Sequence, residues 1–95
     1  MSRYIVLSKL TDEGRRTLKN NPQRIVEVNK EMEAMGVKVV LQYALLGKYD
    51  FLTLLDAPNH KSISKVIGEM NSRGTVDTLT MPAMPVKEFL ESLEK

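Results

Sequence analysis

Hydrophobic and polar positions along the chain follow two periods, one typical of strands and one typical of helices. Stretches rich in strand-forming residues predict four strands, at residues 3–9, 37–46, 49–56 and 75–81. Apolar residues at spacings of three and four predict two longer helices, from Pro22 to Gly36 and from His60 to Ser72. Shorter helices are predicted from Thr11 to Lys19 and after Pro85.

The order of these elements predicts the fold class. Strand, helix, strand, strand, helix and strand, followed by a final helix, is the ferredoxin-like βαββαβ pattern. It is an α+β fold with a four-stranded antiparallel sheet and helices on one face. A chain of 95 residues supplies one adequate core, so we expect a single domain over residues 1–95.

The pair Gly47-Lys48 between the second and third strands predicts a two-residue type II′ hairpin turn. That turn sets a register in which Gln42 faces Thr53, and the period of two then divides the sheet into two faces. We expect the helices to cover the face that holds Ile5, Leu7, Val39, Leu41, Tyr43, Leu45, Leu52, Leu54, Leu79 and Met81.

The opposite face of the predicted sheet is too apolar to be a solvent face. It holds Tyr4, Val6, Ser8, Val40, Gln42, Ala44, Phe51, Thr53, Leu55, Val76, Thr78 and Thr80. No further helices are predicted that would cover it, so a second copy of the sheet is the economical partner. We therefore expect a homodimer or higher homo-oligomer through Val40, Phe51 and Leu55, and we expect Phe51→Asp to destabilise it.

The hydroxyls and the amide on this second face also resemble the lining of a ligand pocket. We expect a small molecule to bind there, at the homodimer interface, with Tyr49, Gln42, Thr53, Thr78 and Thr80 as ligand-binding residues. The alternative is that Gln42 and Thr53 bond to each other and leave no pocket.

Composition removes several classes of function. The chain has no cysteine, which excludes disulfides, thiolate metal sites and thiol nucleophiles. The net charge of +2, the absence of tryptophan and the five aromatic residues give no support to nucleic-acid binding. Apolar runs are far too short to span a membrane, and no signal peptide is predicted. We expect a cytoplasmic protein that has no cofactor, no metal and no nucleic-acid or membrane partner.

Two further features have both a functional and a structural interpretation. His60, the single histidine, could act as a general base or a haem ligand, or it could be a solvated residue at a helix start. The first 24 residues hold six basic and two acidic side chains, with Arg15, Arg16, Lys19 and Arg24 close together. This cluster could receive an anion, or it could be the solvated face of a helix.

The run from Leu46 to Pro58, which begins Leu-Gly-Lys-Tyr-Asp-Phe, resembles the signature segment of the GYD-domain family, named for a Gly-x-Tyr-Asp hairpin. The resemblance extends from Tyr4 to Phe89 and includes Leu10–Gly14, Gly36 and Gly74–Thr80, and the chain departs from the family pattern at Asn59 and Leu79. It implies a ferredoxin-like fold of the dimeric α/β-barrel type. It implies no specific function, because related barrels include cofactor-free enzymes and ligand-sensing modules.

Three classes of function therefore stay open. They are a small-molecule binding protein, a cofactor-free enzyme of the monooxygenase or isomerase type, and a structural or regulatory oligomer without chemistry. The motif residues Gly47, Tyr49 and Asp50 fit more than one of them. Tyr49 could orient a ligand and Asp50 could act as a base. In the structural interpretation, Gly47 supplies the turn, Tyr49 covers the end of the sheet and Asp50 bonds backbone donors.

Overall fold

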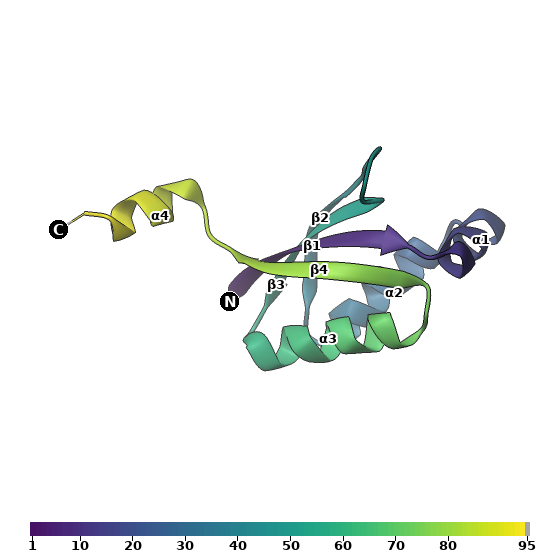
Figure 1. Cartoon of the computed structure of the whole chain (residues 1–95). Coiled ribbons are helices and arrows are strands. Elements are labelled where there is room, and N and C mark those ends of the chain that lie inside the picture. The colour runs from purple at the N-terminus through teal and green to yellow at the C-terminus, as the bar shows by residue number, and fades with distance from the viewer. Residues whose placement is uncertain (95) are drawn as a thin grey trace.

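The computed structural model describes residues 1–94 and has the predicted order of elements (Figure 1). They are β1 (Ser2–Leu10), α1 (Asp12–Asn20), α2 (Arg24–Ala34), β2 (Lys38–Ala44), β3 (Phe51–Ala57), α3 (His60–Ser72), β4 (Val76–Ala83) and α4 (Val86–Ser92). The strands form one four-stranded antiparallel sheet in the order β2-β3-β1-β4. This is the ferredoxin-like α+β fold, as the sequence predicts.

Three helix ends agree with the sequence, whereas α2 begins at Arg24 and not at Pro22. The Thr11 hydroxyl accepts a hydrogen bond from the Gly14 N–H at 3.1 Å and caps α1. The Asn59 side chain accepts from the Ser62 N–H at 2.9 Å and caps α3 in the same way. Gly36 follows α2 with a φ of 86°, a left-handed conformation that few other residues adopt without strain.

Gly14 in α1 lies so close to the backbone of Thr75 that no side chain fits there. A Cβ atom at this position would lie 2.0 Å from the carbonyl oxygen of Thr75. The Thr11 N–H also donates to that carbonyl, at 3.0 Å. The absent side chain therefore lets the start of α1 approach the beginning of β4.

The register of the β2–β3 hairpin agrees with the sequence at its centre and departs from it at both ends. Gln42 faces Thr53, as predicted. β2 ends at Ala44 and β3 begins at Phe51, so residues 45–50 form a longer connection in place of the predicted two-residue turn. At the other end, an irregularity between Val39 and Leu41 leaves Val40 without a directly opposite partner, in the manner of a β-bulge. Beyond it Val39 pairs with Leu55 instead of sharing a face with Leu41.

The assignment of the two sheet faces from the sequence is wrong. Helices α2 and α3 cover the face of Tyr4, Val6 and Leu55, whose side chains are at most 2% exposed. The opposite face, expected to be the inner one, holds Leu41, Tyr43, Leu79 and Met81, all exposed, and Ile5, Leu7, Leu52 and Leu54, half-buried. We refer to this set of eight residues as the open face. Phe51 and Leu55 lie under the helices, so Phe51→Asp does not test an interface on the open side.

The physical reason is that most polar side chains of the covered face find partners there, although the Thr80 hydroxyl does not. Gln42 Nε2 donates to Thr53 Oγ1 at 3.0 Å, and Asn71 Nδ2 on α3 donates to Thr78 Oγ1 at 2.9 Å. The Tyr4 hydroxyl is 2.5 Å from His60 Nδ1. A buried polar group that is hydrogen-bonded is compatible with a core, so the number of apolar side chains did not decide which face is buried.

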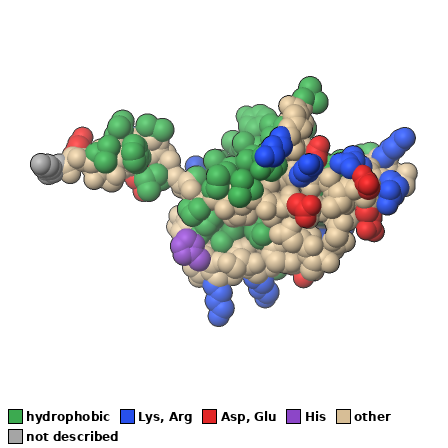
Figure 2. Space-filling view, in the orientation of Figure 1, with side chains coloured by type: hydrophobic (Ala, Val, Ile, Leu, Met, Phe, Trp, Pro, Cys, Tyr) green, Lys and Arg blue, Asp and Glu red, His purple; other side chains and the backbone are tan. Residues whose placement is uncertain are grey.

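The C-terminal helix α4 extends away from the sheet (Figure 1). Hydrophobic side chains gather along it in the space-filling view (Figure 2). They are Met84, Val86, Phe89, Leu90 and Leu93, between 49% and 71% exposed. We refer to residues 84–93 as the C-terminal arm. Among residues 1–94, no helix is long and apolar enough to cross a membrane.

Candidate functional site

A cavity of about 200 Å³ lies between the sheet and the helices that cover it. Helix α2 presents Ile25, Val28, Asn29 and Met32 to it, at the spacing of one helical face. The other apolar lining residues include Val6, Phe51 and Leu55 from the sheet and Ile67 and Met70 from α3. The cavity is thus a mainly apolar, partly open space within one copy of the chain, and the open face of the sheet takes no part in it.

Three polar side chains cross the cavity wall as a hydrogen-bonded row. Asn29 Nδ2 donates to Gln42 Oε1 at 2.9 Å, and Gln42 Nε2 donates in turn to Thr53 Oγ1. The remaining oxygen of this row, Asn29 Oδ1, is buried and has no hydrogen-bond partner among residues 1–94. A buried acceptor without a partner is unfavourable by about 1–3 kcal/mol.

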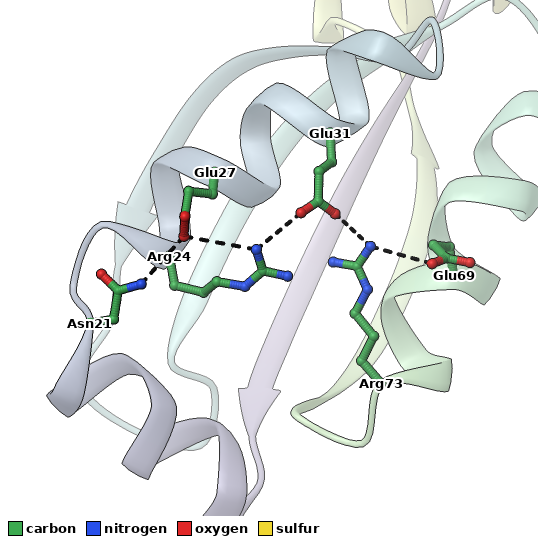
Figure 3. Close-up of polar contacts among 6 residues, drawn as sticks. All are labelled: Asn21, Arg24, Glu27, Glu31, Glu69 and Arg73. Carbon is green, nitrogen blue, oxygen red and sulfur yellow. Dashed lines mark hydrogen bonds and ion pairs between the residues drawn. The ribbon is translucent and has the colours of Figure 1, made fainter.

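A chain of ion pairs lies at the edge of the cavity and connects α2 to the end of α3 (Figure 3). Glu31 on α2 is in its centre, with one carboxylate oxygen 3.0 Å from Arg24 Nη1 and the other 2.5 Å from Arg73 Nη2. Arg73 also contacts Glu69 of α3 at 3.3 Å. Both arginines line the cavity. In Figure 3 the helices stand apart, and the Glu31–Arg73 pair spans the gap between them.

The electrostatics of this chain favour its charged form. The hydrogen bond from Arg73 is the main cause that holds the pKa of Glu31 below its ordinary value of 4.5, and Arg24 adds to the effect. The same hydrogen bond raises the pKa of Arg73. Glu31 is therefore ionised at neutral pH, and its hydrogen bonds are the stronger, charge-assisted kind.

The motif residue Asp50 bonds backbone groups of β1. Its N–H donates to the Ser8 carbonyl at 2.8 Å, and its carboxylate accepts from the Leu10 N–H at 2.7 Å. The β1–β3 pairing ends at Ser8 and Phe51, so the carboxylate takes the place of the next strand carbonyl. This agrees with the structural interpretation of Asp50.

Of the predicted ligand-binding residues, the structure brings Gln42 and Thr53 together, whereas Tyr49, Thr78 and Thr80 are not among the lining residues of the cavity. Gln42 and Thr53 line the cavity, whereas Tyr49 lies outside it in the hairpin loop, where Lys48 Nζ is 5.8 Å from the ring centroid. Thr78 is bonded to α3, and the hydroxyl of Thr80 is buried without a partner among residues 1–94. The sequence predicts a pocket between this face and a second copy of the sheet, but helices of the same chain cover the face, so the cavity lined by Gln42 and Thr53 lies beneath those helices.

His60 lies at the start of α3 and pairs with the buried Tyr4. The two rings are 5.7 Å apart in an edge-to-face arrangement, in addition to the hydrogen bond between them. Of the predicted basic cluster, Arg15 pairs with Asp12 and Arg24 pairs with Glu31, while Arg16 and Lys19 are exposed. Two of the four cations are thus already paired with carboxylates of the same chain.

Sequence reasoning missed Asn29, Glu31 and Arg73. Asn29 carries a readable signal, since it lies four residues after Ile25 and three before Met32, within the apolar stripe of α2. A polar residue at such a position needs a buried partner. Arg73 gives no such signal, because it follows the last turn of α3 and reaches Glu31 only through the tertiary fold.

Comparison with known proteins decides the family. The GYD domain profile matches residues 4–93. The chain belongs to the GYD-domain family. The glutamine synthetase and cystathionine beta-lyase binding protein of Thermus thermophilus is 45% identical to this GYD-domain chain over 95 residues, which cover 99% of this chain and all of the relative.

Solved structures of the same fold are more distant in sequence. FFRP-DM1 has a TM-score of 0.60 at 21% identity, and the match covers 88% of this GYD-domain chain and all of that protein. MtbAldR (Rv2779c) has a TM-score of 0.68 at 16% identity, over 88% of this chain and 53% of the other. At these identities the likeness shows the fold alone.

Proposed function

We propose that this chain is an enzyme-binding protein, and that glutamine synthetase or cystathionine β-lyase is the class of enzyme that it binds. The observation that carries this proposal is the 45% identity to a relative with that name, over the full length of both chains. Exposed apolar surface on the open face, the C-terminal arm and the hairpin loop supports it, because such surface is typical of interaction sites.

We assign the open face and the C-terminal arm to a second copy of the chain. Four strands about 4.8 Å apart and about 20 Å long give a face of roughly 400 Å², or roughly 800 Å² counted on both copies. Stable interfaces bury about 1,200–2,000 Å² in total. The arm is the nearest apolar surface that continues from β4, and its exposed side chains supply the remaining area.

The homodimer is tested by placing a charge on the open face. Leu79 on β4 is 45% exposed in the single chain, so Leu79→Asp does not disturb the core. We expect light scattering to give a dimer for the unmodified protein and a monomer for Leu79→Asp, because a buried unpaired carboxylate is strongly unfavourable. Val26→Asp on α2, at 46% exposure, is the matched control and stays dimeric. A monomer for the unmodified protein contradicts this part of the proposal.

The hairpin tip, residues 46–49, carries exposed apolar surface that is not part of this dimer interface, and we assign it to the enzyme. Leu46 is fully exposed there, beside Lys48 and Tyr49. A few well-placed apolar or aromatic anchors supply most of the binding energy in a typical protein interface.

The enzyme-binding proposal is tested by titrating the purified chain into each of the two enzymes from the same organism, with calorimetry as the readout. We expect saturable binding to at least one enzyme, and an affinity at least tenfold lower for Leu46→Ser. Val26→Ser, a truncation of another exposed aliphatic side chain, leaves the affinity unchanged. Absence of binding to both enzymes overturns the proposal, and equal effects of the two variants remove the hairpin tip from it.

A further inference from the structure

The motif residues Gly47, Tyr49 and Asp50 neither line the cavity nor belong to the open face. They lie in the connection between β2 and β3, and Figure 1 shows this loop standing out from the sheet. We propose that Gly47 and Asp50 are positioning residues that hold Leu46 outward as a single apolar anchor, and that the enzyme receives this anchor in a concave apolar pocket. The inference rests on the proposed enzyme binding and states which partner surface the hairpin tip requires.

Asp50 fixes the base of the hairpin tip through its backbone and its side chain. Its N–H donates to the Ser8 carbonyl at 2.8 Å, and its carboxylate accepts from the Leu10 N–H at 2.7 Å. Its carbonyl oxygen accepts from the Leu45 N–H at 2.8 Å. Asp50 therefore joins the loop to β1 and also joins the two ends of the loop to each other. Leu46 follows the bonded Leu45 directly, so these bonds determine where Leu46 begins to project.

The conformation of the tip itself depends on Gly47, whose φ is 144°. Residues with a side chain rarely adopt this angle, so glycine permits the turn that follows Leu46. A Cβ atom at Gly47 would meet no atom within 4 Å apart from its chain neighbours, so the turn needs the backbone freedom of glycine and not its small size. Lys48 Nζ lies 5.8 Å from the centre of the Tyr49 ring, within the range of a cation–π contact. The other two side chains of the tip thus lie against each other.

Leu46 is completely exposed, whereas Tyr49 is half-buried. A leucine at the end of a projecting loop buries only one side against a flat surface, and a concave pocket surrounds it on all sides. Anchor residues that supply most of the binding energy are typically found in such well-packed pockets, from which water is excluded. The partner surface that fits Leu46 is therefore an apolar pocket of the size of one leucine side chain.

The anchoring bonds act on affinity through Leu46, because a tip that is ordered before binding loses less conformational entropy when it binds. This property separates positioning from a general effect on folding. A change in stability alone reduces the affinity by the same factor whether or not residue 46 is a leucine. A change in positioning reduces the affinity only while the leucine is present, so the two substitutions are not additive.

A double-mutant cycle tests the role of Asp50, with calorimetry as the readout and at a temperature at which circular dichroism shows every variant to be folded. We expect Asp50→Ala to weaken enzyme binding by about threefold to tenfold, and to have little further effect in the Leu46→Ser background. Glu33→Ala is the matched control, because Glu33 is an exposed carboxylate of α2 that forms no ion pair within residues 1–94, and it leaves the affinity unchanged. Equal losses for Asp50→Ala in the two backgrounds overturn the positioning role.

Gly47 and Gly68 provide a matched pair of glycines. An added Cβ atom meets open space at both positions, and of the two only Gly47 has a positive φ. We expect Gly47→Ala to weaken enzyme binding by about threefold or more, and Gly68→Ala to leave it unchanged. Equal affinities for the two variants overturn the role of Gly47.

The shape of the partner surface is tested by the size of residue 46. We expect Leu46→Ala and Leu46→Trp both to weaken binding by about tenfold, because a pocket that fits leucine is left partly empty by alanine and is too small for tryptophan. Val26→Trp, at an exposed position of α2, leaves the affinity unchanged. Binding of Leu46→Trp as tight as that of the unmodified chain overturns the pocket, since a flat surface accepts the larger side chain. Absence of binding of the unmodified chain to both enzymes overturns the proposed function, and this inference with it.

Discussion

The carboxylate of Asp50 is expected to stabilise the fold by replacing a strand carbonyl. Its Oδ2 atom accepts from the Leu10 N–H at 2.7 Å, and its own N–H donates to the Ser8 carbonyl. Replacement by alanine removes the first of these bonds and keeps the second, because the second belongs to the backbone. The Leu10 N–H then has no acceptor beyond the end of the β1–β3 pairing.

The size of the effect follows from the kind of hydrogen bond. A bond to a charged acceptor contributes about 1.5–3 kcal/mol, and a neutral one contributes about 0.5–1.5 kcal/mol. We therefore expect Asp50→Ala to lower the free energy of unfolding by about 2 kcal/mol. Asp50→Asn, which keeps a neutral acceptor, lowers it by about 1 kcal/mol. For a domain of this length, 2 kcal/mol corresponds to a decrease in Tm of about 8–16 °C.

The assay is thermal unfolding followed by circular dichroism at one protein concentration, because a dimer makes the Tm depend on concentration. Asp77→Ala is the matched control, since Asp77 is an exposed carboxylate of β4 and such changes stay within about 0.5 kcal/mol. A Tm for Asp50→Ala equal to that of Asp77→Ala refutes the structural role of the motif aspartate.

Two further perturbations test the packing of α1 and the ion pairs. Gly14→Ala places a Cβ atom 2.0 Å from the Thr75 carbonyl oxygen and should lower the free energy of unfolding by more than about 2 kcal/mol. Gly68→Ala, which has open space around it on α3, is the control and should raise the free energy of unfolding by about 0.5–1 kcal/mol. Similar urea midpoints for the two variants contradict the close approach of α1 to Thr75. Hydrogen bonds from Arg73 and Arg3 are the main causes that lower the pKa values of Glu31 and Asp56 in the folded protein. The two carboxylates therefore stabilise the fold fully at pH values above their ordinary pKa values of 4.5 and 3.8. This stabilisation is lost as the pH falls through the lowered pKa values of the folded state. At pH values below about 4.5 the Tm should therefore decrease with decreasing pH, and the decrease should be less steep for Glu31→Gln. A Tm that stays constant down to pH 3 contradicts the role of these ion pairs.

Element order, caps and hairpin register were readable from the sequence because each depends on local chemistry. Thr11 and Asn59 cap the helices that follow them, and Gln42 faces Thr53. The identity of the buried face was not readable, because both faces alternate with the same period and both are largely apolar. The decision depends on partners distant in sequence, such as Asn71 for Thr78.

The candidate site was only partly predictable for the same reason. Gln42 and Thr53 were recognised as a polar pair, but Asn29 joins them from a helix whose position over the sheet depends on the fold. The bulge at Val40 also breaks the period of two, so Val39 lies on the opposite face from Leu41 although their spacing suggests the same one. A single irregular residue is enough to reverse such an inference for every position beyond it.

The edges of the sheet limit how this chain can assemble. Strands β2 and β4 are the outer strands, and an unprotected outer strand is a template for another chain and for fibre growth. Here β2 begins at Lys38 and bulges at Val40, and β4 includes Pro82, which has no N–H to offer to an incoming strand. Addition of chains strand by strand is thereby disfavoured at both edges. An increase in concentration should therefore produce closed assemblies that stay in solution, and amyloid-like fibres should be suppressed.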